Sequence, residues 1–275
     1  MVPLIPVVLP IYRLYLHMER AHLWALVLAD KSAHYKFLNF LISMTILCIG
    51  AHPDDVEFGC GGLIIKEAQK GSQIKIVVCS LGEAGSSGTP EERKQEAIEA
   101  AKISRVDDIT FIDLGGDSKI ENKPENTFKI AKIIREFKPD IVLAPEMQIN
   151  QHPDHYIVSR LTHTACRVAR YGGLAELKDL ATHSISSLYF YPSRAEMARE
   201  KPNIIIDVSE QYNTWAKAME AHKTQMKTKA YVNLVTTKAA AWGASFGVNY
   251  AMGLWTNDPI RVDHISDLSL SSRNY

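Results

Sequence analysis

Between residues 45 and 145, short apolar segments rich in strand-forming residues alternate with longer segments of helical periodicity. This alternation is typical of β-α-β units, in which parallel strands form a sheet and helices cover both of its faces. We therefore expect an α/β protein with a three-layer, Rossmann-like fold and a mostly parallel sheet. Strands are expected at residues 45–50, 73–80, 109–114, 140–145, 187–191 and 203–208, and helices at residues 61–70, 90–104, 126–138, 154–171, 210–228 and 232–244.

The first 43 residues differ from the rest of the chain. Residues 2–16 are apolar but contain three prolines and Arg13, so they are too short and too interrupted for a transmembrane helix. They also lack the ordered basic and cleavage regions of a signal peptide. We expect residues 1–43 to be an N-terminal extension or a start-site artefact, and residues 44–275 to be the functional domain. A helical or membrane-associating extension is the alternative.

The overall charge balance limits the classes of partner. The chain has 31 basic and 31 acidic side chains among 275 residues, which argues against a nucleic-acid partner because such proteins usually carry a basic excess. No membrane partner is expected for residues 44–275. The four cysteines are scattered and form no CxxC pair, which favours reduced thiols and a cytoplasmic location.

Two short segments concentrate imidazole and carboxylate groups. Residues 51–55 (AHPDD) follow the first expected strand, and residues 152–155 (HPDH) follow the fourth. In open parallel sheets, ligands bind beyond the carboxyl ends of the strands. Glu83 follows the second strand across a short turn, and Asp113 ends the third. Four strand ends therefore bring polar groups to one edge, where we expect the active site.

The residue types at this edge are those of a hydrolytic metal site. His52 and Asp55 can reach one ion from the same turn, and either His152 or His155 would supply a third ligand. Zinc binds two imidazoles and one carboxylate readily and keeps a position open for water. Asp54 diverges from its neighbour and is better placed as a general base for that water. Alternatively, its carboxylate caps the following helix.

These two segments resemble the zinc-dependent N-deacetylases of the LmbE/PIG-L type. That family carries AHPDDxE after its first strand and HPDH later, which correspond here to residues 51–57 and 152–155. The likeness is closest to the bacterial branch that deacetylates N-acetylglucosamine conjugates, including the malate conjugate of bacillithiol biosynthesis. It continues at residues 82–89 (GEAGSSGT), 93–97 (RKQEA) and 221–225 (AHKTQ), and at Tyr231, Tyr250 and Ala251, so it covers roughly residues 44–259.

The resemblance implies a metal centre and a base. Its metal ligands would be His52, Asp55 and His155, and its general base would be Asp54. The implied cofactor is Zn²⁺, although Fe²⁺ would suit the same ligands. Water on the metal would attack an acetyl carbonyl, and acetate and a free amine would be released.

The resemblance also implies roles around the reacting group. His152 would stabilise the oxyanion or protonate the leaving amine, and Asp154 would support that imidazole, although Asp154 could instead cap its own helix. Tyr231 would assist at the oxyanion, while Arg93 and Glu83 would bind the substrate, a small N-acetylated amino sugar. A homo-oligomer, such as a hexamer, is implied too.

Two departures from the family pattern bear on the substrate. Family members often carry an arginine just before the fifth strand, where this chain has residues 183–186 (HSIS), and Tyr-Ala-Glu where residues 250–252 read Tyr-Ala-Met. One alternative therefore keeps the fold and the metal but acts on a chitin oligosaccharide or a mycothiol-type conjugate. A non-catalytic sugar- or nucleotide-binding module is another. A dinucleotide site is disfavoured because residues 59–62 (GCGG) lack the GxGxxG spacing.

Overall fold

The computed structural model describes residues 43–149, 152–193, 201–227 and 230–264. Residues 44–275 form one compact unit. The expected extension, residues 1–43, lies almost wholly outside the described residues. Within the described ranges, no helix is both long and apolar enough to cross a membrane.

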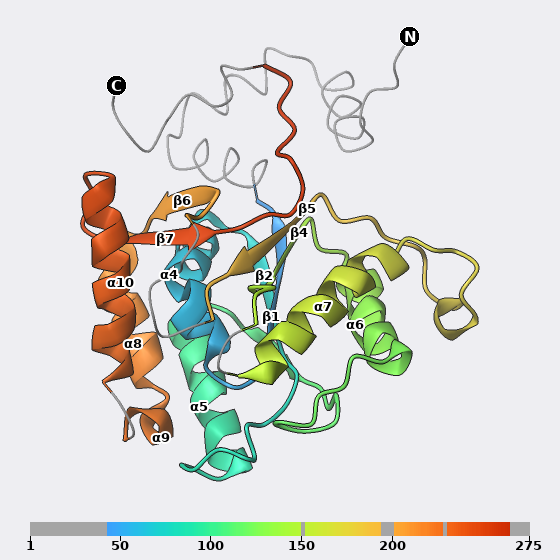
Figure 1. Ribbon diagram of the computed structural model, residues 1–275, viewed down its shortest axis with the longest axis horizontal. Helices are drawn as coiled ribbons and strands as arrows, with labels where there is room; N and C mark the ends of the chain where they lie inside the picture. The colour runs from blue at the N-terminus through green and yellow to red at the C-terminus, as the bar shows by residue number, and fades with distance from the viewer. Residues whose placement is uncertain (1–42, 150–151, 194–200, 228–229, 265–275) are drawn as a thin grey trace, which may run out of the picture. The chain divides into compact units, whose positions relative to one another are not determined.

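Five parallel strands form the central sheet, in the order β3-β2-β1-β4-β5 (Figure 1). They are β1 (Thr45–Gly50), β2 (Gln73–Val78), β3 (Asp108–Phe111), β4 (Ile141–Pro145) and β5 (Ser187–Tyr191). In the middle strand, Cys48 lies opposite Ile76 of β2 and Leu143 of β4. The strand order therefore reverses between β1 and β4, which is the place where open α/β sheets bind their ligands.

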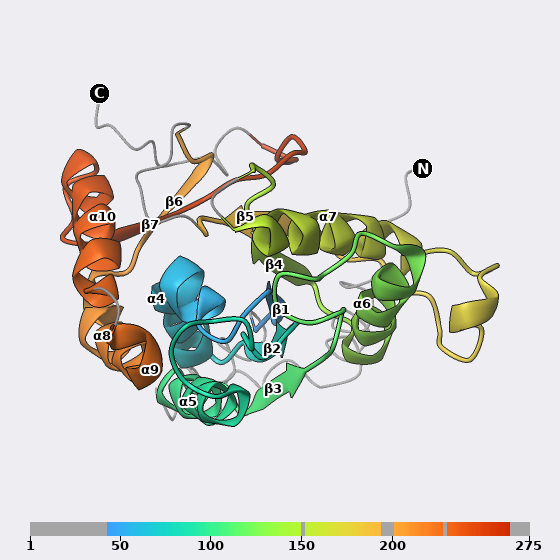
Figure 2. The same ribbon diagram turned by 60° about the horizontal axis from the view of Figure 1, so that its bottom comes forward.

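Helices cover both faces of this sheet, as Figure 2 shows. Helices α4 (Asp55–Lys70), α5 (Pro90–Ile103), α8 (Tyr212–Glu220) and α10 (Tyr231–Ser245) lie on one side, and α6 (Pro124–Phe137) and α7 (Pro153–Val168) lie on the other. A hydrophobic core lies on each face of the sheet. Successive side chains of β1 point into one core and then the other, because side chains alternate along a strand. Ile46 and Cys48 pack toward α4, whereas Leu47 and Ile49 pack toward α6 and α7. The expected three-layer α/β fold is confirmed.

Helix α4 begins at Asp55 rather than at the expected residue 61. Three glycines early in the segment disfavour a helix in isolation, but two of them are needed for close packing. A Cβ at Gly59 would overlap the ring of Tyr191, and one at Gly61 would lie 2.8 Å from Trp215. The helix is kinked at Cys60, where φ is −144°. It ends at Gly71, as expected, with a left-handed φ of 99°.

The last part of the domain adds a second, two-stranded antiparallel sheet. It contains β6 (Ile204–Asp207) and β7 (Ala251–Leu254), and only the first of these was expected. The expected helix 210–228 is divided, because the non-helical backbone of His222 (ψ 61°) separates α8 from the short α9 (Lys223–Met226). Two 3₁₀ helices complete the described elements: η1 (Ala175–Leu177) and η2 (Ser209–Gln211).

Candidate metal centre and active site

The loop after β1 is organised by the side chain of Asp55. Its Oδ2 accepts hydrogen bonds from the backbone N–H groups of Ala51 (2.7 Å) and His52 (3.0 Å). Burial works against the charged form of this carboxylate, but the adjacent His155 and His52 outweigh it and hold the pKa of Asp55 well below its usual range. The loop therefore presents an ionised carboxylate beside two imidazoles.

Three buried side chains at this edge form a group that suits a metal ion. The donor atoms of His52, Asp55 and His155 all lie within 4.8 Å of one another, and His155 Nε2 is 3.0 Å from Asp55 Oδ1. The Nδ1 atom of His155 is buried without a hydrogen-bond partner. Two imidazoles and one carboxylate are a donor set that Zn²⁺ accepts, with a position left for a further ligand. The three expected ligands are thus brought together in space.

Two further carboxylates surround the imidazole of His52. Its Nε2 lies 3.2 Å from Asp117 Oδ1 and 3.3 Å from Asp154 Oδ2. Burial opposes protonation, but the hydrogen bonds to Asp117 and Asp154 prevail and raise the pKa of His52 to about 10. With His152, these residues make a second group of four whose donor atoms lie within 4.8 Å of one another. Asp117 was not among the expected site residues.

Asp154 lies beside the imidazoles of the site. Its carboxylate is 3.3 Å from His52 Nε2, belongs to the same group of donors as His152, and accepts the backbone N–H of Ser118 at 2.7 Å. Its backbone N–H, in turn, donates to His152 Nδ1 at 3.4 Å. The carboxylate near the other nitrogen of His152 is that of Asp117, 3.5 Å from Nε2.

His152 is the N-cap residue of α7 and is only half-buried. Its ring centroid lies 4.3 Å from that of His52 and 5.2 Å from that of His155. Burial and the charges of these two imidazoles lower the pKa of His152. A half-buried imidazole with a lowered pKa, beside a buried group of ligands, is suited to exchanging protons with a bound molecule.

Asp54 is the N-cap residue of α4 and has a strained backbone. Its φ is 135°, and its side chain makes no capping hydrogen bond, so the carboxylate does not cap the helix in the way that the alternative expected. Burial, followed by the charge of Asp55, raises the pKa of Asp54 to about 6. Left-handed non-glycine residues cost about 1–3 kcal/mol each and concentrate at active sites. The side chain of Asp54 lines the cavity of the site.

Arg93 of α5 is buried against the loops after β1 and β2. Its Nη1 donates to the carbonyl of Gly82 at 2.7 Å, and its Nη2 lies 3.5 Å from Asp54 Oδ2. Gly82 has a φ of 66°, and a Cβ there would overlap the guanidinium group. This arginine therefore touches both the cavity and the proposed base.

Glu83 lies outside the cavity. Its Oε1 accepts the backbone N–H of Asp117 at 2.8 Å, and its Oε2 accepts that of Leu81 at 3.0 Å. The structure thus places it as a link between the loop after β2 and the turn that carries Asp117. Asp113, expected at the same edge, accepts the backbone N–H of Gly115 at 2.7 Å and is exposed.

One cavity of about 430 Å³ joins these groups. It is lined by the three candidate ligands and by Asp54, Arg93 and His152. Tyr231, at the start of α10, lines another part of it and stacks on Phe58 with ring centroids 5.5 Å apart. The fold and this cavity define an α/β enzyme with a candidate metal centre at the carboxyl edge of its sheet.

Comparison with known proteins identifies the family. Residues 47–166 match the PIG-L family, described as GlcNAc-PI de-N-acetylase. A solved structure, the conserved protein TT1542 from Thermus thermophilus, is 30% identical over 80% of this chain and 97% of its own, with a TM-score of 0.71. The chain therefore belongs to the PIG-L family of N-deacetylases.

Two curated relatives show the range of the family. The diacetylchitobiose deacetylase of Thermococcus kodakarensis is 27% identical over 76% of this chain and 81% of its own length. The 4-oxalmesaconate hydratase of Pseudomonas putida is 24% identical over 64% of this chain and 70% of its own. The curated relatives of this chain thus include a protein that is named for a different reaction.

Proposed function

We propose that this protein is a zinc-dependent hydrolase that removes the acetyl group from an N-acetylglucosamine-type conjugate. The observation that carries the proposal is the position of Asp54, a partly buried carboxylate with a raised pKa that shares one cavity with the group formed by His52, Asp55 and His155. The family and its relative named as a deacetylase support the reaction. The conjugate is a malate glycoside, a chitin oligosaccharide or a mycothiol-type compound.

His52, Asp55 and His155 would hold the metal. When bound, Zn²⁺, or Fe²⁺ on the same donors, would polarise the acetyl carbonyl and lower the pKa of a water molecule. The donor set is compatible with either ion. Asp117 and Asp154 orient the ring of His52 by hydrogen bonding, as carboxylates commonly do for metal-ligating imidazoles.

Asp54 would accept the proton of the attacking water. A general base is most effective when its pKa lies near the working pH, and the raised pKa of Asp54 brings it closer to neutrality than an exposed aspartate. Arg93 holds this carboxylate in place from the side of α5. The tetrahedral intermediate would then collapse as its carbon–nitrogen bond breaks.

His152, whose ring lines the cavity from the start of α7, would in its charged form donate a proton to the departing amine, and the proton held by Asp54 would then replace the one that His152 gave up. Tyr231, fixed by its stacking on Phe58, would donate a hydrogen bond to the oxyanion. We also propose a cytoplasmic location and a homo-oligomeric state. The buried, free condition of all four cysteines is consistent with the first.

The test is release of acetate and primary amine from N-acetylglucosamine, N,N′-diacetylchitobiose and N-acetylglucosaminyl malate by zinc-loaded protein. Asp54→Asn is the decisive variant, because it keeps the size of the side chain and removes the base. We expect it to retain about one zinc per chain by metal analysis and to lose about 10²–10⁴-fold in kcat. Full activity in Asp54→Asn would contradict the assigned base, and the absence of acetate release from all three substrates would contradict the reaction.

A further inference from the structure

Five buried side-chain atoms of the described residues have no hydrogen-bond partner: Arg93 Nε, Ser104 Oγ, His155 Nδ1, Ser159 Oγ and His222 Nδ1. Buried polar atoms normally find a partner, so each exception calls for an explanation. Two of the five, His155 Nδ1 and Ser159 Oγ, belong to α7, and their residues are four positions apart. An unpartnered hydroxyl therefore lies one helical turn from an unpartnered nitrogen of a candidate metal ligand.

His155 and Ser159 share one face of α7. Residues four apart on a helix have Cβ atoms about 5–6 Å from each other. Both side chains face the interior, since Ser159 is 0% exposed and His155 is 9% exposed. Side chains of a helix lean toward its N-terminus, so that of Ser159 leans toward the turn that carries His155. Rotation about one bond, among three staggered positions, directs its hydroxyl toward the imidazole.

Other hydroxyls of α7 make a bond that Ser159 does not make. The hydroxyls of Thr162 and Thr164 each donate to the backbone carbonyl four residues earlier, at 2.8 and 3.0 Å. Serine and threonine inside helices commonly bond in this way. For Ser159 that carbonyl belongs to His155, yet the serine hydroxyl has no partner among the described residues. The hydroxyl is therefore available to the ring of the same histidine.

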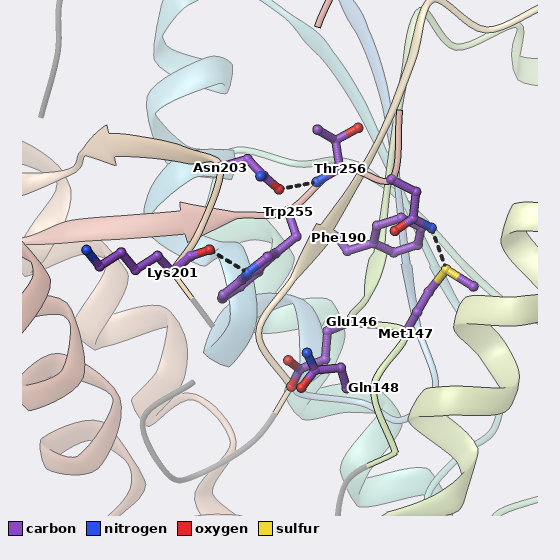
Figure 3. A pocket seen from close by; sticks show the side chains of 9 residues that line it. Glu146, Met147, Gln148, Phe190, Lys201, Asn203, Trp255 and Thr256 are labelled. Carbon is purple, nitrogen blue, oxygen red and sulfur yellow. Dashed lines mark hydrogen bonds between the residues drawn. The ribbon is translucent and has the colours of Figure 1, made fainter. Parts of the chain in front are cut away.

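The surroundings of Ser159 offer no ligand from solvent. The residue is fully buried, and it lines neither the active-site cavity nor the smaller hollow of about 230 Å³ beside Trp255, which Figure 3 shows. Its neighbours in α7, Val158 and Leu161, belong to an apolar core together with Leu47 of β1. Apolar side chains cannot form a hydrogen bond with a hydroxyl, so we look for its partner on α7 itself.

The chemistry of a metal-bound imidazole supplies this partner. His155 Nε2 lies 3.0 Å from Asp55 Oδ1, so Nε2 is the nitrogen on the side of the candidate ligands. A neutral imidazole that binds a metal through one nitrogen carries its proton on the other. Metal-ligating imidazoles almost always donate this proton to an acceptor, which fixes the ring. A serine hydroxyl can accept it and still donate its own proton to the carbonyl of His155.

We propose that Ser159 is a positioning residue for His155, and that its hydroxyl oxygen accepts the Nδ1 proton of the imidazole when Nε2 binds the metal. This hydrogen bond orients the ring and raises its basicity. Asp117 and Asp154 surround His52 in a comparable way, so each imidazole of the metal group would have its own partner. The inference rests on the proposed function, because it assumes that His155 is a metal ligand.

Ser159→Ala tests the inference, because it removes the hydroxyl and little else. We expect zinc affinity, measured by competition with a chromophoric chelator, to fall about 10–100-fold, the usual loss when a metal-ligating imidazole loses its partner. The Tm of the metal-free protein should not fall, because a buried hydroxyl without a partner does not stabilise the fold. Ser104→Ala is the matched control: Ser104 Oγ is also buried and unpartnered, but it follows α5 and does not line the cavity. Its zinc affinity should equal that of the wild type.

NMR can observe the hydrogen bond directly. In zinc-loaded protein with ¹⁵N-labelled histidine, the Nδ1 proton of His155 should move upfield in Ser159→Ala, because a hydrogen bond deshields the proton that it holds. Ser104→Ala should leave this resonance in place. A resonance that also stays in place in Ser159→Ala would overturn the hydrogen bond.

The affinities separate this inference from the proposed function. Equal zinc affinity in the wild type and Ser159→Ala overturns the inference, as does an equal loss in Ser104→Ala or a loss matched by a lower Tm of the metal-free protein. The proposed function survives these results if the wild type releases acetate. If zinc binds but no acetate is released, the proposed function fails, while weaker binding by Ser159→Ala still supports the inference. A wild type that binds no zinc overturns both.

Discussion

Arg93 Nη2 lies 3.5 Å from Asp54 Oδ2, so the arginine expected to bind substrate is also paired with the proposed base. The same guanidinium reaches the carbonyls of Gly82 and Pro53. A residue that anchors two loops and a reacting group affects the geometry of the site before any substrate arrives.

Arg93→Lys tests this relationship. An ammonium group cannot reproduce the planar fork that contacts two carbonyls and a carboxylate at once. Loss of one hydrogen bond to a charged group is worth about 1.5–3 kcal/mol, which predicts a fall in kcat/KM of about 10–100-fold. The exposed Arg160 of α7 is the control, since Arg160→Lys should leave the rate unchanged in the same acetate-release assay. Similar rates for both variants would show that the anchoring is dispensable.

Asp117→Asn should weaken the metal centre. The variant keeps the shape of the side chain but removes the charge beside His52, and losses of carboxylates behind metal-ligating imidazoles typically cost about 10–100-fold in affinity or activity. Competition with a chromophoric chelator measures zinc affinity directly. Asp113→Asn is the matched control, because Asp113 is exposed and its carboxylate accepts the backbone N–H of Gly115 in its own turn. An equal loss in the two variants would rule out a specific role for Asp117.

Gly82→Ala should reduce both stability and activity. Its left-handed backbone disfavours a side chain by about 1–3 kcal/mol, and the added methyl group would also displace Arg93. Gly71 provides the comparison, since its φ is 99° but no atom lies within 4 Å of a Cβ there. Gly71→Ala should lower the midpoint of urea unfolding without changing kcat/KM. If Gly82→Ala also lowers the midpoint of unfolding without changing kcat/KM, activity does not depend on the exact position of Arg93.

Removal of the metal should destabilise the folded protein. A ligand at 100 times its Kd stabilises the native state by about 2.7 kcal/mol, so chelation should lower Tm and added Zn²⁺ should restore it. His155→Ala removes a proposed ligand, and its Tm should therefore respond little to chelator. Differential scanning calorimetry with and without chelator provides the measurement. A chelator effect of the same size in His155→Ala would place the ion elsewhere.

Most of the fold could be predicted from the sequence because its strands are buried on both faces and appear as continuous apolar segments. Strand β5, for example, has the expected boundaries. Strand β7 was missed, since Ala251–Leu254 is short and contains a glycine, and its pairing with β6 depends on contacts distant in the sequence. The break at His222 was missed for a similar reason: this buried ring faces Glu57 of α4 at 3.3 Å.

The candidate site could be predicted where its residues follow a strand directly. His52 and Asp55 are held by the end of β1. They line one cavity together with two other expected residues, Asp54 and His155. Asp117 follows two glycines in a turn well beyond β3, with no local pattern to connect it to His52. Glu83 follows β2 at the edge of the sheet where the site lies. Its carboxylate, however, accepts the backbone N–H groups of Leu81 and Asp117 and does not line the cavity.

The pairing of β1 with β4 joins segments that are distant in the chain, since β2, β3 and their helices intervene. His52 follows the first of these strands, and His155 lies in the helix after the second. The two imidazoles can therefore meet only after that long-range pairing has formed, a slow kind of event during folding. The time course of zinc binding by the refolding chain would consequently report when β1 and β4 pair and the central sheet forms.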